Sequence, residues 1–281
     1  MSSLWIAVVF AVFMWWFCTG IVLLLDTLPS TTFRWSMLIS SALSVAALLG
    51  LAHTAQQTSL AGAYCAFTCA LLVWGWHELS FLTGWITGPR KTALPAIVTG
   101  WPRFTAAVQA ILWHELAIMA VGALIIAITW NAPNQVGTGT FVLLWVMRVS
   151  AKLNLFLGVR NLSEEFLPPH LAYMASFFRR RRLNALLPWS VLGGSIGVAL
   201  LVNAALAPGV APATAVGSTL VASLLALAVV EHLMLVMPLN ATALWRWAMR
   251  KHPPGAVATT AGAAKAHAIA PTTDNSLFHA R

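Results

Sequence analysis

Histidine and glutamate stand side by side in three apolar stretches of the sequence. The tetrapeptide Trp-His-Glu-Leu occurs at residues 76–79 and again at 113–116, and the reversed pair Glu-His occurs at 231–232. Imidazole and carboxylate groups bind metal ions and carry protons, and a histidine can also be the axial ligand of a tetrapyrrole. The candidate ligands for a metal ion or a pigment are therefore His77, Glu78, His114, Glu115, Glu231 and His232.

The composition places these pairs inside a membrane. Hydrophobic residues make up 59% of the chain and charged residues only 8%, with a mean hydropathy of +0.81, whereas soluble domains have about 25% charged residues. A helix needs about 20 apolar residues to cross a bilayer. We predict an all-α, polytopic membrane helix bundle with seven spans, at about 4–25, 35–53, 60–85, 104–130, 136–156, 186–207 and 214–237.

The positions of Lys and Arg predict the orientation of this bundle. Basic residues follow the first, third, fifth and seventh spans, whereas the connections at about 54–59, 131–135 and 208–213 contain none. Because basic residues are retained on the cytoplasmic side of a membrane, we predict a periplasmic N-terminus and a cytoplasmic C-terminus. This distribution also accounts for the net charge of +9 without a nucleic-acid partner.

The connection at 157–185 is the predicted cytoplasmic functional loop. Its charged and imidazole side chains are candidates for contact with a partner protein or with anionic lipid headgroups. They are Glu164, Glu165, His170, Arg179, Arg180, Arg181 and Arg182. We assign residues 1–240 to a transmembrane domain, and residues 241–281 to a basic segment followed by a tail that we expect to be disordered.

The fifth predicted span adds two cations, Arg148 and Lys152, at the depth of the His-Glu pairs. An ionised residue at a helix centre costs about 2.5–3.5 kcal/mol to insert, so these charges must face one another or a cofactor. One hypothesis is a structural network of glutamates and cations, another is a divalent metal or di-metal centre, and a third is a tetrapyrrole held by one histidine. Adjacent helical residues diverge by about 100°, which disfavours both members of a pair ligating one metal ion.

Three runs of sequence resemble a known family. The run 66–84 contains Trp-Gly-Trp-His-Glu-Leu-Ser-Phe, the run 144–158 contains Met-Arg-Val-Ser-Ala-Lys, and the run 164–171 is Glu-Glu-Phe-Leu-Pro-Pro-His-Leu. They are similar to the photosynthetic-complex assembly family of PuhE type, found in purple phototrophic bacteria, over roughly residues 1–240. The resemblance implies a multi-pass protein of the bacterial inner (intracytoplasmic) membrane, associated with reaction-centre assembly and bacteriochlorophyll supply. It transfers no catalytic residue.

The residues and the resemblance together give a functional interpretation. We expect an assembly factor for the reaction-centre/antenna complex, which handles bacteriochlorophyll or a precursor in a His/Glu-lined pocket in the cytoplasmic half of the membrane. Its expected partners are the bilayer and subunits of that complex or pigment-synthesis proteins. One alternative is a membrane metalloenzyme acting on a tetrapyrrole or isoprenoid, and another is a structural subunit without a ligand. The resemblance favours pigment binding over a generic metal enzyme, and we therefore expect a non-enzymatic role.

Overall fold

Seven long helices make up most of this chain. The computed structural model describes residues 2–162, 164–237 and 241–249, which contain no β-strand. All seven helices are long and apolar enough to cross a membrane, which confirms the predicted polytopic helical bundle. They are α1 (Ser2–Asp26), α2 (Phe33–Thr54), α3 (Leu60–Leu82), α4 (Gly100–Ile128), α5 (Val136–Leu157), α6 (Leu186–Ala205) and α7 (Pro212–Met234), with short 3-10 helices η1 (Ser30–Thr32), η2 (Glu164–Phe166), η3 (Pro169–Phe177) and η4 (Ala241–Trp245).

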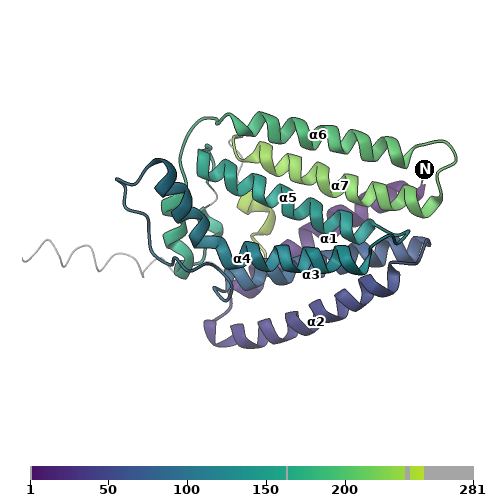
Figure 1. Ribbon diagram of the computed structural model, residues 1–281, viewed down its shortest axis with the longest axis horizontal. Helices are drawn as coiled ribbons and strands as arrows, with labels where there is room; N and C mark the ends of the chain where they lie inside the picture. The colour runs from purple at the N-terminus through teal and green to yellow at the C-terminus, as the bar shows by residue number, and fades with distance from the viewer. Residues whose placement is uncertain (1, 163, 238–240, 250–281) are drawn as a thin grey trace, which may run out of the picture. The chain divides into compact units, whose positions relative to one another are not determined.

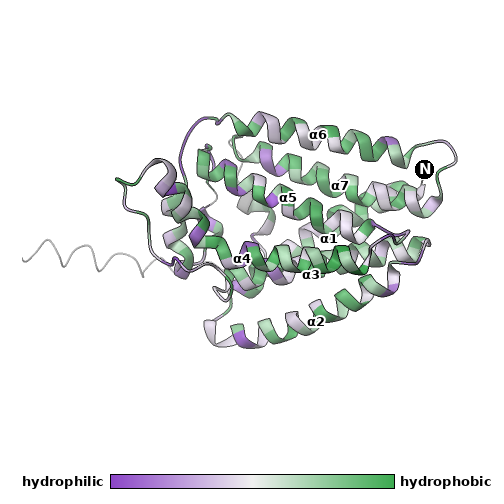
Figure 2. Cartoon of the chain, in the orientation of Figure 1, coloured by the Kyte–Doolittle hydropathy of each residue, from purple (hydrophilic) through white to green (hydrophobic). Residues whose placement is uncertain are grey.

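Helices α3 and α7 form the centre of the bundle, and most of their residues are buried. α2 packs along α3, α6 packs along α7, and α1 and α5 contact both central helices (Figure 1). Phe67 of α3 and Leu220 of α7 are completely buried against α1, and Phe141 joins α5 to α3 and α4. Hydrophobic residues run along all seven helices (Figure 2), and many of the large ones are exposed, as expected for helices that contact lipid.

The two ends of the bundle differ in charge. The N-terminus lies at the same end as the connections 55–59, 129–135 and 206–211 (Figure 1), which contain no Lys or Arg. The connections 83–99 and 158–185 lie at the opposite end, which we call the basic end. The asymmetry follows the predicted pattern, and the assignment of the basic end to the cytoplasm stays a prediction.

The segment after α7 turns back onto α1. The indole Nε1 of Trp16 donates to the carbonyl oxygen of Leu244 at 3.0 Å, and Nε1 of Trp245 donates to the carbonyl oxygen of Trp16 at 3.1 Å. Residues 241–249 thus pack with the membrane helices. Residues 250–281, where the disordered tail is predicted, lie outside the described residues, so the predicted domain division stays a prediction.

Local signals fix the ends of α3. Ser59 begins the helix, because its hydroxyl oxygen accepts a hydrogen bond from the backbone N–H of Gly62 at 3.1 Å. The helix ends at Leu82, three residues before the predicted end. The reason is Gly84, whose φ of 78° lies in the left-handed region that stops a helix.

The connection after α3 inserts its backbone into α4. The N–H of His114 donates to the carbonyl oxygen of Thr87 at 2.9 Å, and the N–H of Arg90 donates to the carbonyl oxygen of Gln109 at 3.4 Å. Both bonds divert groups from the regular hydrogen-bond ladder, which is a known cause of helix bends, and Figure 1 shows α4 bent near its first third. The bend fixes the helical turn that carries His114.

Only glycine fits between these two bonds. A Cβ atom at Gly88 would lie 2.0 Å from the backbone oxygen of Gln109 and 2.6 Å from the carbonyl carbon of Ala110. Backbone atoms cannot move aside as a flexible side chain can. The sequence alone did not reveal this role for Gly88.

We therefore expect Gly88→Ala to lower the thermal unfolding temperature of the purified protein by several degrees, because the connection must withdraw from α4. The measurement is fluorescence-detected size-exclusion after heating. Gly193→Ala is the matched control, since nothing lies within 4 Å of a Cβ at Gly193 and alanine favours a helix. Equal unfolding temperatures for the two variants would show that the backbone contact is absent.

Candidate functional site

Two ion pairs on α5 join three helices. Arg148 Nη2 lies 2.6 Å from Oε2 of Glu78 on α3, and Lys152 Nζ lies 2.6 Å from Oε1 of Glu115 on α4. The cations are one helical turn apart, so they reach the two glutamates from the same face of α5. Both carboxylates are largely shielded, with 15% and 20% of their side chains exposed. Each of these four charges thus has an opposite charge within hydrogen-bond distance.

The histidines adjacent to these glutamates turn toward each other. His77 is completely buried and His114 is 1% exposed, and their ring centroids are 6.4 Å apart. The centroid of the Phe81 ring lies 4.6 Å from that of the His114 ring, with the two rings tilted by 45°, and the Phe141 ring lies 5.9 Å from the His77 ring. Because adjacent residues diverge around a helix, each His-Glu pair sends its carboxylate to α5 and its imidazole to the other histidine.

Several polar atoms around the histidines have no hydrogen-bond partner among the described residues. Both ring nitrogens of His77, Nδ1 of His114 and Oε1 of Glu78 are buried and unpartnered. An unpartnered buried polar group costs about 1–3 kcal/mol. These atoms are therefore the ones available to a ligand or to ordered water.

Glu231 lies apart from the two ion pairs. Its Oε1 accepts a hydrogen bond from Trp15 Nε1 of α1 at 2.8 Å, and neither described ion pair includes it. The sequence placed Glu231 about six residues before the end of its span, but α7 ends at Met234, so Glu231 is in the last helical turn. That position is nearer to the basic end and exposed.

His232 belongs to a different polar network, between α5, α6 and α7. Its Nε2 is 2.9 Å from Ser150 Oγ, and its Nδ1 is 2.8 Å from the carbonyl oxygen of Ala228. Ser150 in turn donates to Ser190 Oγ at 2.9 Å, and Asn154 Nδ2 donates to the same oxygen at 3.1 Å. The structure thus brings His77 and His114 together but directs His232 to the opposite side of α5.

Asn184 extends this second network to the basic end. Its Nδ2 donates to the carbonyl oxygens of Asn154 and Gly158 at the end of α5, at 3.3 and 3.0 Å. Its Oδ1 accepts from the N–H groups of Leu186 and Leu187 at the start of α6, at 2.8 and 3.1 Å. One side chain thus caps two helices. An asparagine just before an apolar run is a capping signal that could have indicated this residue.

The loop candidates take different positions. His170 Nε2 lies 2.7 Å from the carbonyl oxygen of Leu82, so this histidine covers the end of α3. Glu164 and Glu165 are exposed, and neither forms an ion pair within the described residues. Arg180 forms an isolated parallel β-bridge with Val159. Among these contacts, the β-bridge of Arg180 is the one that involves the four consecutive arginines at 179–182.

Arg103 is a buried residue that the sequence indicated only as a topological signal. Its Nη2 donates to the carbonyl oxygens of Phe156 and Phe177, at 2.9 and 2.6 Å, and its guanidinium lies 3.8 Å from the centroid of the Phe156 ring. This side chain ties the start of α4 to the end of α5 and to the loop. Its position at a span end gave no indication of burial.

The geometry does not favour a metal centre. Among the described residues, no group of three or more His, Cys, Asp or Glu side chains is arranged to hold a metal ion. The physical reason is that Glu78 and Glu115 are engaged by cations, which leaves the imidazoles of His77 and His114. Two shallow hollows lie elsewhere, on the outer face of α1. The larger of these two has a volume of about 460 Å³ and is lined by Trp5, Ile6, Val9, Phe10 and Phe13.

Comparison with known proteins gives two matches. A family model described as "Protein of unknown function (DUF3623)" matches residues 1–256. A Rhodobacter capsulatus protein named "Uncharacterized 30.4 kDa protein in puhA 5'region" is 35% identical over 251 residues, which cover 88% of this chain and 91% of that protein. No solved structure matches the chain significantly.

The ion pair between Lys152 and Glu115 generates a double-variant prediction. Lys152→Met leaves a shielded carboxylate unpaired and should lower the free energy of unfolding by about 3 kcal/mol. This value is the lower end of the range for a broken buried pair, because about a fifth of each side chain is exposed. Adding Glu115→Gln should restore most of the stability. Thermal unfolding in detergent measures both effects.

Lys91→Met is the control for this pair, because Lys91 is exposed and outside both described ion pairs. It should unfold at the wild-type temperature. If the double variant were no more stable than Lys152→Met alone, the pair would not be the source of the loss.

Proposed function

This chain belongs to the DUF3623 family, and we propose that it is an assembly factor for the photosynthetic reaction-centre/antenna complex of the bacterial inner (intracytoplasmic) membrane. In this proposal the protein handles bacteriochlorophyll or a related pigment at the paired histidines. The loop 158–185 faces subunits of that complex or pigment-synthesis proteins.

The link to photosynthesis rests on the gene position of the R. capsulatus relative. Its name places it in the 5′ region of puhA, which lies in the photosynthesis gene cluster. The relative matches this chain over most of both lengths, so the similarity is not confined to a single helix. A multi-pass bundle is also the kind of protein that can meet pigments within the bilayer.

The observation that carries the pigment proposal is the unpartnered pair His77 and His114. A neutral imidazole in apolar surroundings is the usual axial ligand of a tetrapyrrole metal. Phe81 and Phe141 next to the rings supply apolar, aromatic walls. Arg148 and Lys152 on the facing helix are paired with Glu78 and Glu115, so the two imidazoles are the groups that this site offers to the ligand. The donor set thus fits the chemistry of the ligand.

The packing around His77 and His114 leaves no space for a tetrapyrrole macrocycle. Both histidines are buried to 1% exposure or less, so a macrocycle can reach them only if a helix moves. α4 is the helix suited to this, because its buried residues form a single narrow stripe. The stripe contains Arg103, Ala106, Ala110, His114, Ile118, Gly122 and Ile125. Movement of α4 away from α3 would open the histidine pair sideways to the bilayer.

Two alternatives bear on this proposal. A metalloenzyme is disfavoured by the engagement of Glu78 and Glu115 in ion pairs. A structural subunit without a ligand leaves the histidine nitrogens to ordered water, and this alternative is separated from the proposal by experiment.

The test is absorption spectroscopy and elemental analysis of protein gently purified from phototrophic cells. The wild type should carry pigment without a stoichiometric redox metal. His77→Ala and His114→Ala should each lose most of the bound pigment and reduce the accumulation of photosynthetic complexes, because each removes one imidazole of the proposed site. His53→Ala, which alters an exposed histidine of α2, should retain both properties.

Normal complexes in cells carrying either histidine variant would refute the site. Two metal ions per chain would favour the metalloenzyme. A wild-type protein that folds without pigment or metal would favour the structural subunit.

A further inference from the structure

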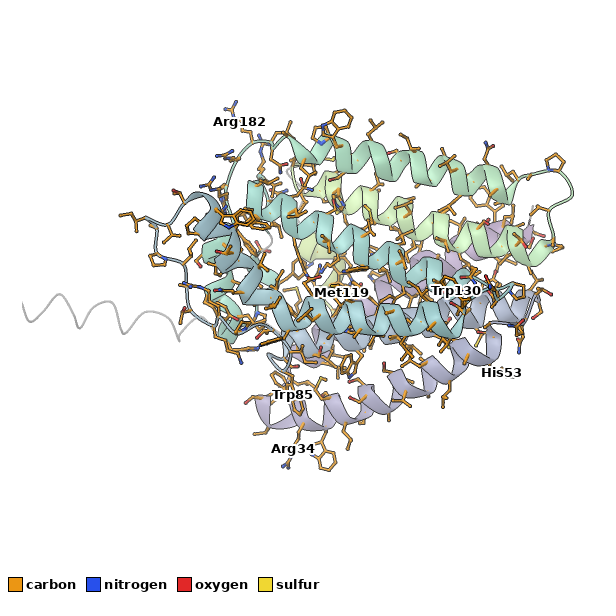
Figure 3. All side chains as sticks on the ribbon, viewed as in Figure 1. Arg34, His53, Trp85, Met119, Trp130 and Arg182 are labelled. Carbon is orange, nitrogen blue, oxygen red and sulfur yellow. The ribbon has the colours of Figure 1, made fainter. Side chains whose placement is uncertain are left out.

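Four consecutive arginines precede α6, and a fifth at the start of α4 lies close to two of them; we call these five residues the arginine platform. They are Arg103, Arg179, Arg180, Arg181 and Arg182. Arg103 is buried, Arg179 is half-buried, and the other three are exposed. Figure 3 shows Arg182 projecting outward at the corner of the bundle above α6. This surface is independent of the histidine pair.

The backbone of the platform is held in place. The N–H of Val159 donates to the carbonyl oxygen of Arg179 at 3.1 Å, and the N–H of Arg181 donates to the carbonyl oxygen of Val159 at 3.0 Å. The stem of Arg181 lies over Gly158, where a Cβ would come within 2.8 Å of Arg181 Cγ. Asn184 fixes the next turn of chain to both α5 and α6. The arginine side chains thus extend from an anchored segment.

The platform has no internal counter-charge. Arg179 and Arg181 lie close enough to Arg103 for their charges to repel it. The ion pairs of the described residues involve only Arg148 and Lys152, so no described carboxylate neutralises the platform. Crowded like charges of this kind are relieved by an anion, and guanidinium groups bind phosphate oxygens with two parallel hydrogen bonds.

The surroundings place this anion at a membrane surface. Leu183 and Trp189, on either side of the start of α6, are 54% and 70% exposed. A large exposed indole beside a helix end is typical of the lipid headgroup region. A soluble acidic protein would leave these apolar side chains against water or polar groups, which costs free energy. A lipid instead covers them with its acyl chains.

We infer that the arginine platform binds the phosphate of an acidic phospholipid in the leaflet at the basic end. The exposed residues Arg180 and Arg182 meet the headgroup, while Trp189 and Leu183 contact the chains. Arg103 holds the platform from below through the carbonyl oxygens of Phe156 and Phe177. The inference does not rest on the pigment proposal.

The experiment uses the full-length protein in phosphatidylcholine nanodiscs with added phosphatidylglycerol, and native mass spectrometry counts the lipids retained. The wild type should retain phosphatidylglycerol in preference to phosphatidylcholine. Arg180→Gln with Arg182→Gln should weaken this retention by roughly 10- to 30-fold, as expected for two surface arginines, with an unchanged unfolding temperature. Inorganic phosphate should not displace the lipid at equal concentration.

The control is Arg90→Gln with Lys91→Gln, which removes the same charge at the same end of the bundle. This variant should retain phosphatidylglycerol as the wild type does. Equal losses in the two double variants would overturn the inference in favour of a diffuse charge effect. Unchanged lipid retention by the platform variant, with loss of an acidic protein partner, would overturn it in favour of protein recognition, and displacement by inorganic phosphate would overturn the lipid assignment.

Discussion

Glu78 and Glu115 can remain charged in an apolar layer because two cations of α5 reach them at 2.6 Å. Without an opposite charge nearby, placing an ionised side chain in this layer would cost free energy and destabilise the folded protein. The pairs also decide the rest of the local geometry. With their carboxylates turned to α5, the His-Glu dipeptides have their imidazoles turned toward each other. The enclosed histidines depend on these two pairs.

The helices and the need for charge pairing could be predicted from the sequence, because both follow from transfer free energies that depend on residue type. Seven apolar runs of sufficient length could hardly fold otherwise than as seven spans. The divergence of adjacent residues on a helix also indicated that each pair would separate. The sequence could not show which glutamate meets which cation, nor that His232 faces Ser150, because these depend on the rotation of each helix about its axis.

Other features escaped prediction because they are contacts of backbone atoms distant in sequence. Gly88 fits against Gln109, Arg103 binds the carbonyl oxygen of Phe177, and Asn184 binds that of Gly158. In each case the residue type admits ordinary interpretations, as a turn glycine, a topological arginine or a polar loop residue. A cap signal precedes α6, but nothing in the pattern indicates that the same asparagine also holds α5.

The bond between His114 and Thr87 has a consequence for the order in which the bundle assembles. Because the bend of α4 is made by backbone atoms of the preceding connection, α4 can reach its final shape as soon as α3 and the connection have been synthesised. The contacts that bend α4 therefore need no residue that follows α4 in the chain. The cations that pair with Glu78 and Glu115 lie on α5, so the charge balance of the histidine layer depends on a segment that follows both carboxylates in the chain.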